Sequence, residues 1–319
     1  MVNYIMLECI MVVTMATINQ VENNAYSIHP QMNVMFCLSY LVLGDKPALI
    51  DPGSTAQARI ILESLKSDLG FDLERLAYII PTHLHLDHGG GAGYVAQQLP
   101  QAQVIVHQRY KKHLQNPSTL VKAFKNTFGD DFADNYGQVL PVPEGQIIGI
   151  DDGDEIDLGD RILKAFVTRG HANHHISLLD TNTQGLFCGD TLGMYFPWID
   201  GIVVVCPEGF DLDLQLDSID RLKQIKPEKL FFAHEGTGEN PLELMQRTAR
   251  QLEDCQRVVQ ASIADGDNLL QTENRLGTYF RSNVSTELNY KKMYLGLTAG
   301  GYRKYLQKPP KQVTVKGGN

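Results

Sequence analysis

The chain has 319 residues, which is long enough to build one large domain or two modest ones around a buried core. Hydrophobic residues make up 43% and charged residues 20%, as in an ordinary soluble globular protein. The formal net charge of −9 repels polyphosphate, so it argues against nucleic acid as a partner. The five cysteines are scattered and never form a CxxC pair, which argues against a disulfide framework and predicts buried free thiols in a reducing cytoplasm.

The N-terminal segment Ile5–Ile18 is apolar, but it contains Glu8 and is too short to cross a bilayer. No Lys or Arg precedes it, which disfavours a signal peptide, and the methionines at positions 6, 11 and 15 leave the natural start open. No other apolar run approaches the length of a membrane span. We therefore expect a cytoplasmic protein without membrane contacts, and we assign residues 1–25 to an N-terminal extension whose order the sequence does not define.

The first half of the chain alternates short apolar runs with segments of helical periodicity. Apolar runs predict strands, the first two joined as a hairpin, over Met35–Leu43, Ala48–Ile50, Leu76–Ile80 and Val104–Val106. Helical spacing predicts a helix over Ala56–Leu69 and a mostly helical segment over 107–137. Because Leu76–Ile80 runs directly into Pro81-Thr82-His83, the histidines that follow lie on a loop leaving a strand, a usual place for site residues.

The second half continues with strands and ends in helices. A meander around the turn Asp151–Asp154 is predicted from Ile147–Ile150 and Arg161–Thr168. A hairpin follows, with strands Ile176–Leu179 and Leu186–Cys188, and then a single strand, Leu230–Ala233. Helices are predicted over Asp213–Ile225 and over 241–306, the latter with breaks near Gly266, Asn283 and Gly300. This order predicts a four-layer α/β core over 26–240, a helical cap or extension over 241–307 and a disordered tail over 308–319.

Ligand-type side chains are concentrated in the run Thr82-His83-Leu84-His85-Leu86-Asp87-His88. Four of them, three histidines and an aspartate, fall within six residues, although the chain has only ten histidines. Imidazole nitrogens and carboxylate oxygens are ligands that borderline divalent cations such as Zn²⁺ accept. A chance cluster, or histidines that cap a helix, is the structural alternative. The spacing and the flanking Gly89-Gly90-Gly91, which lets the backbone pass close to a metal or substrate, favour a metal site.

Three later residues, His171, Asp190 and His234, each follow a predicted strand. Taken singly, a histidine at the end of a strand is more often a structural residue. Together, however, the three share one arrangement with the histidine run, because each stands at the end of a successive strand. Loops at one edge of a layered fold can gather such distant residues into one pocket.

Several motifs, in order over about residues 30 to 240, resemble the metallo-β-lactamase superfamily. They are the Thr82–His88 run, Thr168–His175, Cys188–Thr191 and Ala233–Gly236, with Leu49–Gly53 and Asp152–Gly159 as further matches. The resemblance implies an αββα sandwich with a dinuclear site, for which zinc is the expected metal and iron or manganese the alternatives. By position, it implies one metal held by His83, His85 and His171, a second held by Asp87, His88 and His234, and Asp190 as the bridge between them.

The chain departs from the family pattern at one point. The third motif usually reads Gly-His-Thr-x-Gly-His, whereas here it reads Gly170-His171-Ala172-Asn173-His174-His175. His174 therefore replaces a glycine, either as a change in local packing or as a residue that lines the pocket. The apolar segment Gly193–Ile199, with the only tryptophan, is likewise either core or pocket wall. In the second case Tyr195 could donate a hydrogen bond to the substrate, as a tyrosine does in certain lactonases of the family, although the spacing is longer here.

The ligand set and the resemblance together indicate an enzyme. The expected activity is that of a dinuclear zinc-dependent hydrolase in which a metal-bridging hydroxide attacks a carboxylic ester-type bond, such as a lactone or thioester, while Asp87 orients or relays a proton. The expected substrate is a small molecule with an apolar portion. The alternatives are a phosphodiesterase or nuclease-type hydrolase and an iron-dependent sulfur dioxygenase or redox protein on the same fold. The C-terminal helices could cap the pocket or form the surface of a homodimer.

Overall fold

The computed structural model describes residues 16–32, 37–130, 134–286 and 292–308. A first sheet of seven strands follows the chain order. Its strands are β1 (Ala16–Glu22), β2 (Ala25–Pro30), β3 (Ser39–Val42), β4 (Ala48–Ile50), β5 (Tyr78–Ile80), β6 (Gln103–His107) and β7 (Ile147–Ile150). The pairs from β1 to β4 are antiparallel, and those from β4 to β7 are parallel. The carboxyl ends of β4, β5 and β6 therefore meet at one edge.

The second sheet has the order β15-β14-β11-β10-β9-β8 and packs face to face against the first. Its strands are β8 (Glu155–Asp157), β9 (Ile162–Val167), β10 (Ile176–Asp180), β11 (Gly185–Gly189), β14 (Lys229–Phe232) and β15 (Thr237–Gly238). A separate ribbon pairs β12 (Met194–Phe196) with β13 (Gly201–Val203). Buried apolar side chains fill the space between the sheets, among them Tyr40, Ile80, Ile176, Phe187 and Phe231.

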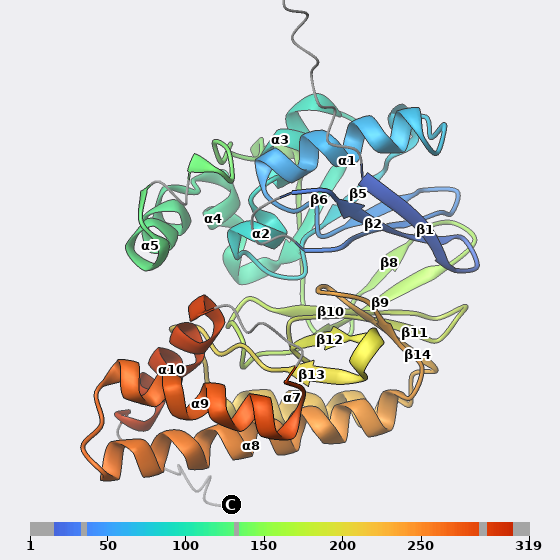
Figure 1. Cartoon of the computed structure of the whole chain (residues 1–319). Helices are drawn as coiled ribbons and strands as arrows, with labels where there is room; N and C mark the ends of the chain where they lie inside the picture. Colours follow the sequence, from blue (N-terminus) through green and yellow to red (C-terminus); the bar gives the residue numbers. More distant parts are fainter. Residues whose placement is uncertain (1–15, 33–36, 131–133, 287–291, 309–319) are drawn as a thin grey trace, which may run out of the picture.

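Helices cover the outer faces of both sheets, so the protein has the four αββα layers that were predicted (Figure 1). On the first sheet these are α1 (Thr55–Ser67) and α3 (Ala92–Gln98), with α2 (Leu86–Gly89), α4 (Lys111–Gln115) and α5 (Ser118–Phe128) at its edge. On the second they are α7 (Leu212–Ile225), α8 (Pro241–Ala264), α9 (Leu269–Asn283) and α10 (Lys292–Leu306). Short 3₁₀ turns are η1 (Leu73–Arg75), η2 (Gln108–Tyr110), η3 (Glu144–Gln146) and η4 (Pro197–Ile199).

Three of the longer helices, α1, α7 and α9, begin where a side chain satisfies a free backbone N–H group. Ser54 caps α1 in a reciprocal box: its Oγ accepts from the N–H of Gln57 at 3.2 Å, and the Gln57 side chain accepts from the N–H of Ser54 at 3.0 Å. Asn268 caps α9 in the same way, and Asp211 caps α7. The first-turn caps fix the directions in which these helices leave the sheets.

Three details differ from the sequence-based expectations. β7 pairs in parallel with β6, so Asp151–Asp154 is a crossing between the two sheets and the predicted meander is wrong. β1 begins at Ala16, within the segment 1–25 that was assigned to an N-terminal extension, and it pairs with β2. Gly300 lies inside α10, so the predicted break there is wrong.

Several expectations fall on residues that the structure does not describe: residues 1–15 with Cys9, residues 35–36 of the first predicted strand, and residues 309–319 of the tail. The four other cysteines are buried and free, as predicted. Among the helices of the described ranges, none combines the length and the hydropathy that a membrane span needs.

Candidate metal centre

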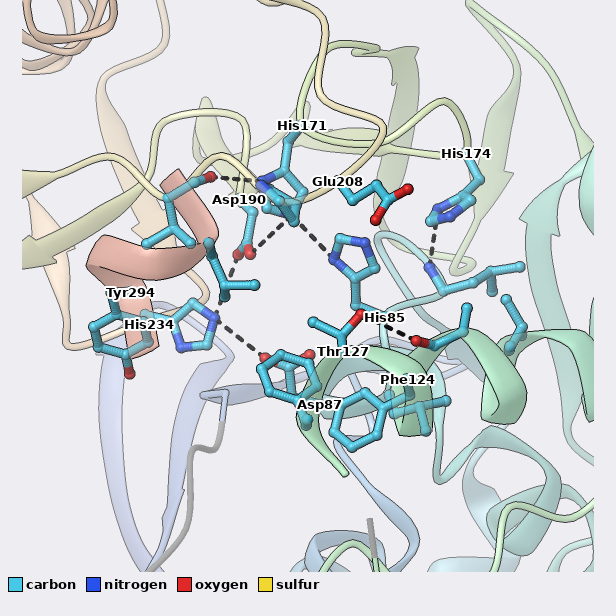
Figure 2. A pocket seen from close by; sticks show the side chains of 18 of the residues that line it. His85, Asp87, Phe124, Thr127, His171, His174, Asp190, Glu208, His234 and Tyr294 are labelled. Atoms are coloured by element: carbon cyan, nitrogen blue, oxygen red, sulfur yellow. Dashed lines mark hydrogen bonds and ion pairs between the residues drawn. The ribbon is translucent and has the colours of Figure 1, made fainter. Parts of the chain in front are cut away.

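The strand ends bring all seven predicted ligands to one edge of the sandwich. Figure 2 shows His85, Asp87, His171, Asp190 and His234 among them. His83, His85, Asp87 and His88 follow β5 and enter α2. The other three come from the second sheet: His171 lies between β9 and β10, Asp190 follows β11, and His234 follows β14. Each layer therefore contributes to one constellation, as the resemblance implied.

Three imidazole nitrogens converge in a first cluster. His85 Nδ1 lies 2.9 Å from His83 Nε2 and 3.0 Å from His171 Nε2. A second cluster forms around His88, whose Nε2 lies 3.3 Å from His234 Nε2 and 3.6 Å from Asp87 Oδ2. Each cluster offers three donor atoms that one ion could bind.

Asp190 lies between the two clusters. Its Oδ2 is 3.4 Å from His171 Nε2 in the first cluster, and its Oδ1 is 3.4 Å from His88 Nε2 and 3.5 Å from His234 Nε2 in the second. Oδ1 is buried and makes no hydrogen bond to the described residues. A buried carboxylate oxygen without a hydrogen-bond donor is available to coordinate a cation.

The outer partners of the imidazoles decide which ring nitrogens face inward. His171 Nδ1 lies 3.2 Å from the carbonyl oxygen of Val205, to which it donates. His83 Nδ1 lies 3.2 Å from Thr82 Oγ1, and because the Thr82 hydroxyl donates to Asp51, the imidazole is the donor in this contact. The inward Nε2 atoms of both rings are then unprotonated. Both Nε2 atoms then offer a lone pair beside His85 Nδ1, and unprotonated ring nitrogens are the form that binds a metal, so the donor set fits bound metal.

The pKa directions agree with this assignment in the first cluster, whereas in the second cluster the neighbouring carboxylates, Asp190 first, outweigh burial and raise the pKa of His88 and His234. Burial, followed by the neighbouring His88 and His85, holds the pKa of His83 well below its usual value. Burial by itself would raise the pKa of Asp190, but the imidazoles of His88, His234 and His171 hold it well below its usual range. Neutral imidazoles and an ionised carboxylate are the forms that bind a metal.

Asp51 is a residue of the site that sequence reasoning did not assign. It follows β4, and the parallel pairing of β4 with β5 places it beside the Thr82–His88 loop. One carboxylate oxygen accepts from the backbone N–H of Thr82 at 2.7 Å, and the other lies 3.2 Å from His88 Nδ1. Asp51 has a positive φ of 50°, an unusual conformation for a residue other than glycine. Its carboxylate therefore fixes both the loop and the tautomer of His88.

Replacing Asp51 with asparagine is expected to lower metal affinity by about 10–100-fold. The amide –NH₂ would face His88 Nδ1–H, so the imidazole proton would shift to Nε2, inside the cluster. Chelator competition measures the affinity. The control is Asp220→Asn on α7, an exposed position that pairs with Lys223. Equal metal affinity in the Asp51 variant and the wild-type protein would contradict this role.

His175 positions Asp190. Its Nε2 accepts from the backbone N–H of Asp190 at 3.0 Å, and its Nδ1 donates to Thr168 Oγ1 at 2.8 Å. Burial lowers the pKa of His175 to about 3, so the imidazole stays neutral and can accept this bond. Gly189 has a φ of 50°, and a Cβ at this position would overlap His175. Glycine is thus required where β11 delivers Asp190.

A cavity of about 560 Å³ opens beside the two clusters. α5 and α10 face each other across it, one from each half of the protein (Figures 1 and 2). Its walls are mainly apolar, and they include Leu84, Leu120, Phe124, Phe128, Met194 and Leu297. The polar lining comes largely from the metal-site residues, together with His174, Tyr294 and Glu208. The described lining contains no Lys or Arg.

The structure answers the two open questions about the pocket wall. His174 does line the cavity, so it is more than a local packing change. Tyr195 does not: its hydroxyl donates to Asp200 Oδ1 at 3.0 Å and its ring packs on Phe232. The catalytic role expected for Tyr195 is therefore corrected. Of the apolar stretch after Asp190, Met194 and Val205 reach the cavity, whereas other members pack in the core.

The fold and the site define a metal-dependent hydrolase with ligands from both sheets. A model of the metallo-beta-lactamase superfamily matches residues 32–234, and the chain belongs to this superfamily. A metallo-beta-lactamase fold-containing protein, ST1585 of Sulfurisphaera tokodaii, is 31% identical over 202 residues, which cover 62% of this chain and 72% of that protein.

Two further similarities bear on activity and fold. A hydroxyacylglutathione hydrolase of Synechococcus sp. is 27% identical over 195 residues, which cover 60% of this chain and 60% of that relative. The crystal structure of metallo-beta-lactamase family protein TTHA1429 from Thermus thermophilus superposes with a TM-score of 0.69 at 18% identity, over 89% of this chain and 93% of that one. The second similarity supports the fold alone.

Proposed function

We propose that the protein is a dinuclear zinc hydrolase that cleaves a carboxylic ester-type bond, a lactone or thioester, in a small molecule with an apolar acyl part. The observation that carries the proposal is the position of Asp190, whose two oxygens face different ligand clusters beside an apolar cavity. His83, His85 and His171 would hold one ion, Asp87, His88 and His234 the other, and Asp190 would bridge them.

Two cations held by these residues would supply a nucleophilic water at neutral pH and would polarise the carbonyl oxygen of the substrate. The chain's own residues provide the remaining functions. Asp87 is buried, lines the cavity and has its Oδ2 3.8 Å from His234 Nε2, so its carboxylate can accept the proton that the attacking water loses. The walls around Phe124 and Leu297 bind the acyl part and exclude bulk water.

The charge of the cavity supports an ester without anionic groups. Glutathione thioesters carry carboxylates and phosphodiesters carry a phosphate, and either would be stabilised by Lys or Arg. The described lining offers neither, and the chain as a whole has a net charge of −9. The same charge argues against nucleic acid as a partner. We further propose that α8 to α10 form the cap of the pocket and, from the buried free thiols, that the protein works in the cytoplasm.

Metal analysis followed by a substrate panel tests the proposal. The purified protein is expected to hold two zinc ions per chain and to hydrolyse lactones and thioesters with apolar acyl chains faster than β-lactams or bis-p-nitrophenyl phosphate. Hydrolysis of the phosphodiester without any ester turnover would reverse the proposal. Bound iron together with oxygen uptake in the presence of glutathione persulfide would replace it with a redox function.

A further inference from the structure

His174 presents a hydrogen-bond donor to the cavity. Its loop joins β9 to β10, and it occupies the position at which the family pattern has glycine. His174 Nδ1 accepts the backbone N–H of Leu84 at 3.1 Å. Because a nitrogen that accepts a hydrogen bond carries no proton, the proton of the neutral imidazole is on Nε2.

The Nε2–H group of His174 has no hydrogen-bond partner within the described part of the chain. Nε2 makes no hydrogen bond to the described residues, and it is not one of their enclosed unpaired polar atoms, although His174 lines the cavity. The His174 imidazole therefore borders the cavity with an Nε2 atom that is not sealed from solvent. The backbone contact to Leu84 holds the ring at a fixed angle, so the donor is preorganised.

The position of His174 fits a contact next to the reacting group. Its ring centroid lies 5.7 Å from that of His85, and it stacks on His83 at 6.1 Å with an interplanar angle of 12°. His174 is thus about one side chain beyond the first cluster. His174 and Asp190 line the same cavity, so a substrate bound there can contact both residues.

We propose that His174 Nε2–H donates a hydrogen bond to an oxygen atom in the acyl part of the substrate, near the scissile carbonyl, and so selects esters that carry such an oxygen. This inference rests on the proposed function and deepens it, because it names the substrate class as oxygen-substituted acyl esters. No proton is transferred in this contact.

Three p-nitrophenyl esters test the contact: the pentanoate and its 3-oxa and 4-oxa analogues, in which an ether oxygen replaces one CH₂. Each kcat/KM is divided by the rate constant of alkaline hydrolysis, which removes differences in intrinsic reactivity. In the wild-type protein, the normalised kcat/KM of one oxa ester is expected to exceed that of the pentanoate by about tenfold, which is the effect of one hydrogen bond. In His174→Leu this preference, taken as the ratio of the normalised kcat/KM values of the oxa ester and the pentanoate, is expected to fall to about onefold.

Two variants separate the donor from a structural role. His174→Gln can accept from Leu84 through its amide oxygen and donate through its amide nitrogen, so it is expected to retain part of the preference. Asn173→Ala changes the preceding, exposed residue, which lines a different surface cavity, and is expected to retain all of it.

Two results would overturn the inference while leaving the proposed function intact. One is an equal preference in the wild-type protein and in His174→Leu. The other is an equal loss on all three esters together with lower metal content, which would make His174 only a support for the loop at Leu84. Absence of turnover of all three esters by metal-loaded protein would instead contradict the proposed function, and the inference with it.

Discussion

Replacing Asp190 with asparagine is expected to lower kcat/KM for ester hydrolysis by about 10³-fold, because metal ions stabilise the transition state by several kcal/mol. The two carboxylate oxygens face different clusters, and an amide would turn an –NH₂ group toward one of them. The variant should also bind less metal than the wild-type protein. Steady-state kinetics and metal analysis of the same preparation measure both effects.

The control for this variant is Asp217→Asn, which changes an exposed aspartate on α7. It is expected to keep both activity and metal content. The Asp190 variant should still fold, because the hydrogen bond from the backbone N–H of residue 190 to His175 Nε2 does not involve the side chain that is changed. A folded Asp190→Asn protein with wild-type activity and metal content would contradict the bridging role.

Replacing Gly301 with alanine is expected to destabilise the protein by about 3 kcal/mol, the upper part of the range for overpacking. α10 packs so closely on the segment after β13 that a Cβ at Gly301 would overlap the carbonyl oxygen of Cys206. This is backbone, which cannot turn aside as a side chain can. α10 carries Tyr294 and Leu297 into the cavity wall. The variant is therefore also expected to show a smaller ratio between its kcat/KM values for long and short acyl esters.

The neighbouring residue provides a matched control. At Gly300, in the same helix, an added Cβ would meet no atom within 4 Å. Gly300→Ala is therefore expected to stabilise the protein by about 0.5–1 kcal/mol through the higher helix propensity of alanine. Denaturant unfolding measures both variants. Similar stabilities for the two would show that α10 is not docked as described.

The sequence predicted that the candidate ligands lie together, because their placement depends on local order. A strand that ends in a ligand-type residue delivers it to the sheet edge whatever the rest of the chain does, and this holds for His171, Asp190 and His234. The spacing within the Thr82–His88 run is likewise local. The layers followed from the alternation of strands and helices.

Other features depend on pairing that a single sequence does not display. Asp51 entered the sequence analysis only as part of the Leu49–Gly53 match, without a role of its own, and its contact with His88 exists only because β4 and β5 are neighbours. β7 was joined to the wrong partner because an apolar run of four residues does not reveal its sheet. Cavity walls from α5 and α10 are equally invisible, since these helices are far apart in the chain.

The orientation of Tyr195 depends on its position within the short strand β12. β12 is only three residues long, and successive side chains of a strand point to opposite faces. Met194 lines the cavity, so Tyr195 points away from it, toward Asp200. The composition of the segment suggested an aromatic wall, but the register of the strand decides which side chain reaches the substrate.

The origin of the ligands in both sheets has a consequence for folding. With the proposed ligand set, each cation would cross-link two layers that are otherwise joined by packing and a few hydrogen bonds, such as that from the Tyr40 hydroxyl to the carbonyl oxygen of Phe232 at 2.5 Å. Binding to the folded state alone adds about 2.7 kcal/mol of stability per site when free metal is a hundredfold above Kd. Scarcity of metal would then weaken the sandwich at its open edge as well as stop the reaction, and the lifetime of the protein would follow the supply of its metal.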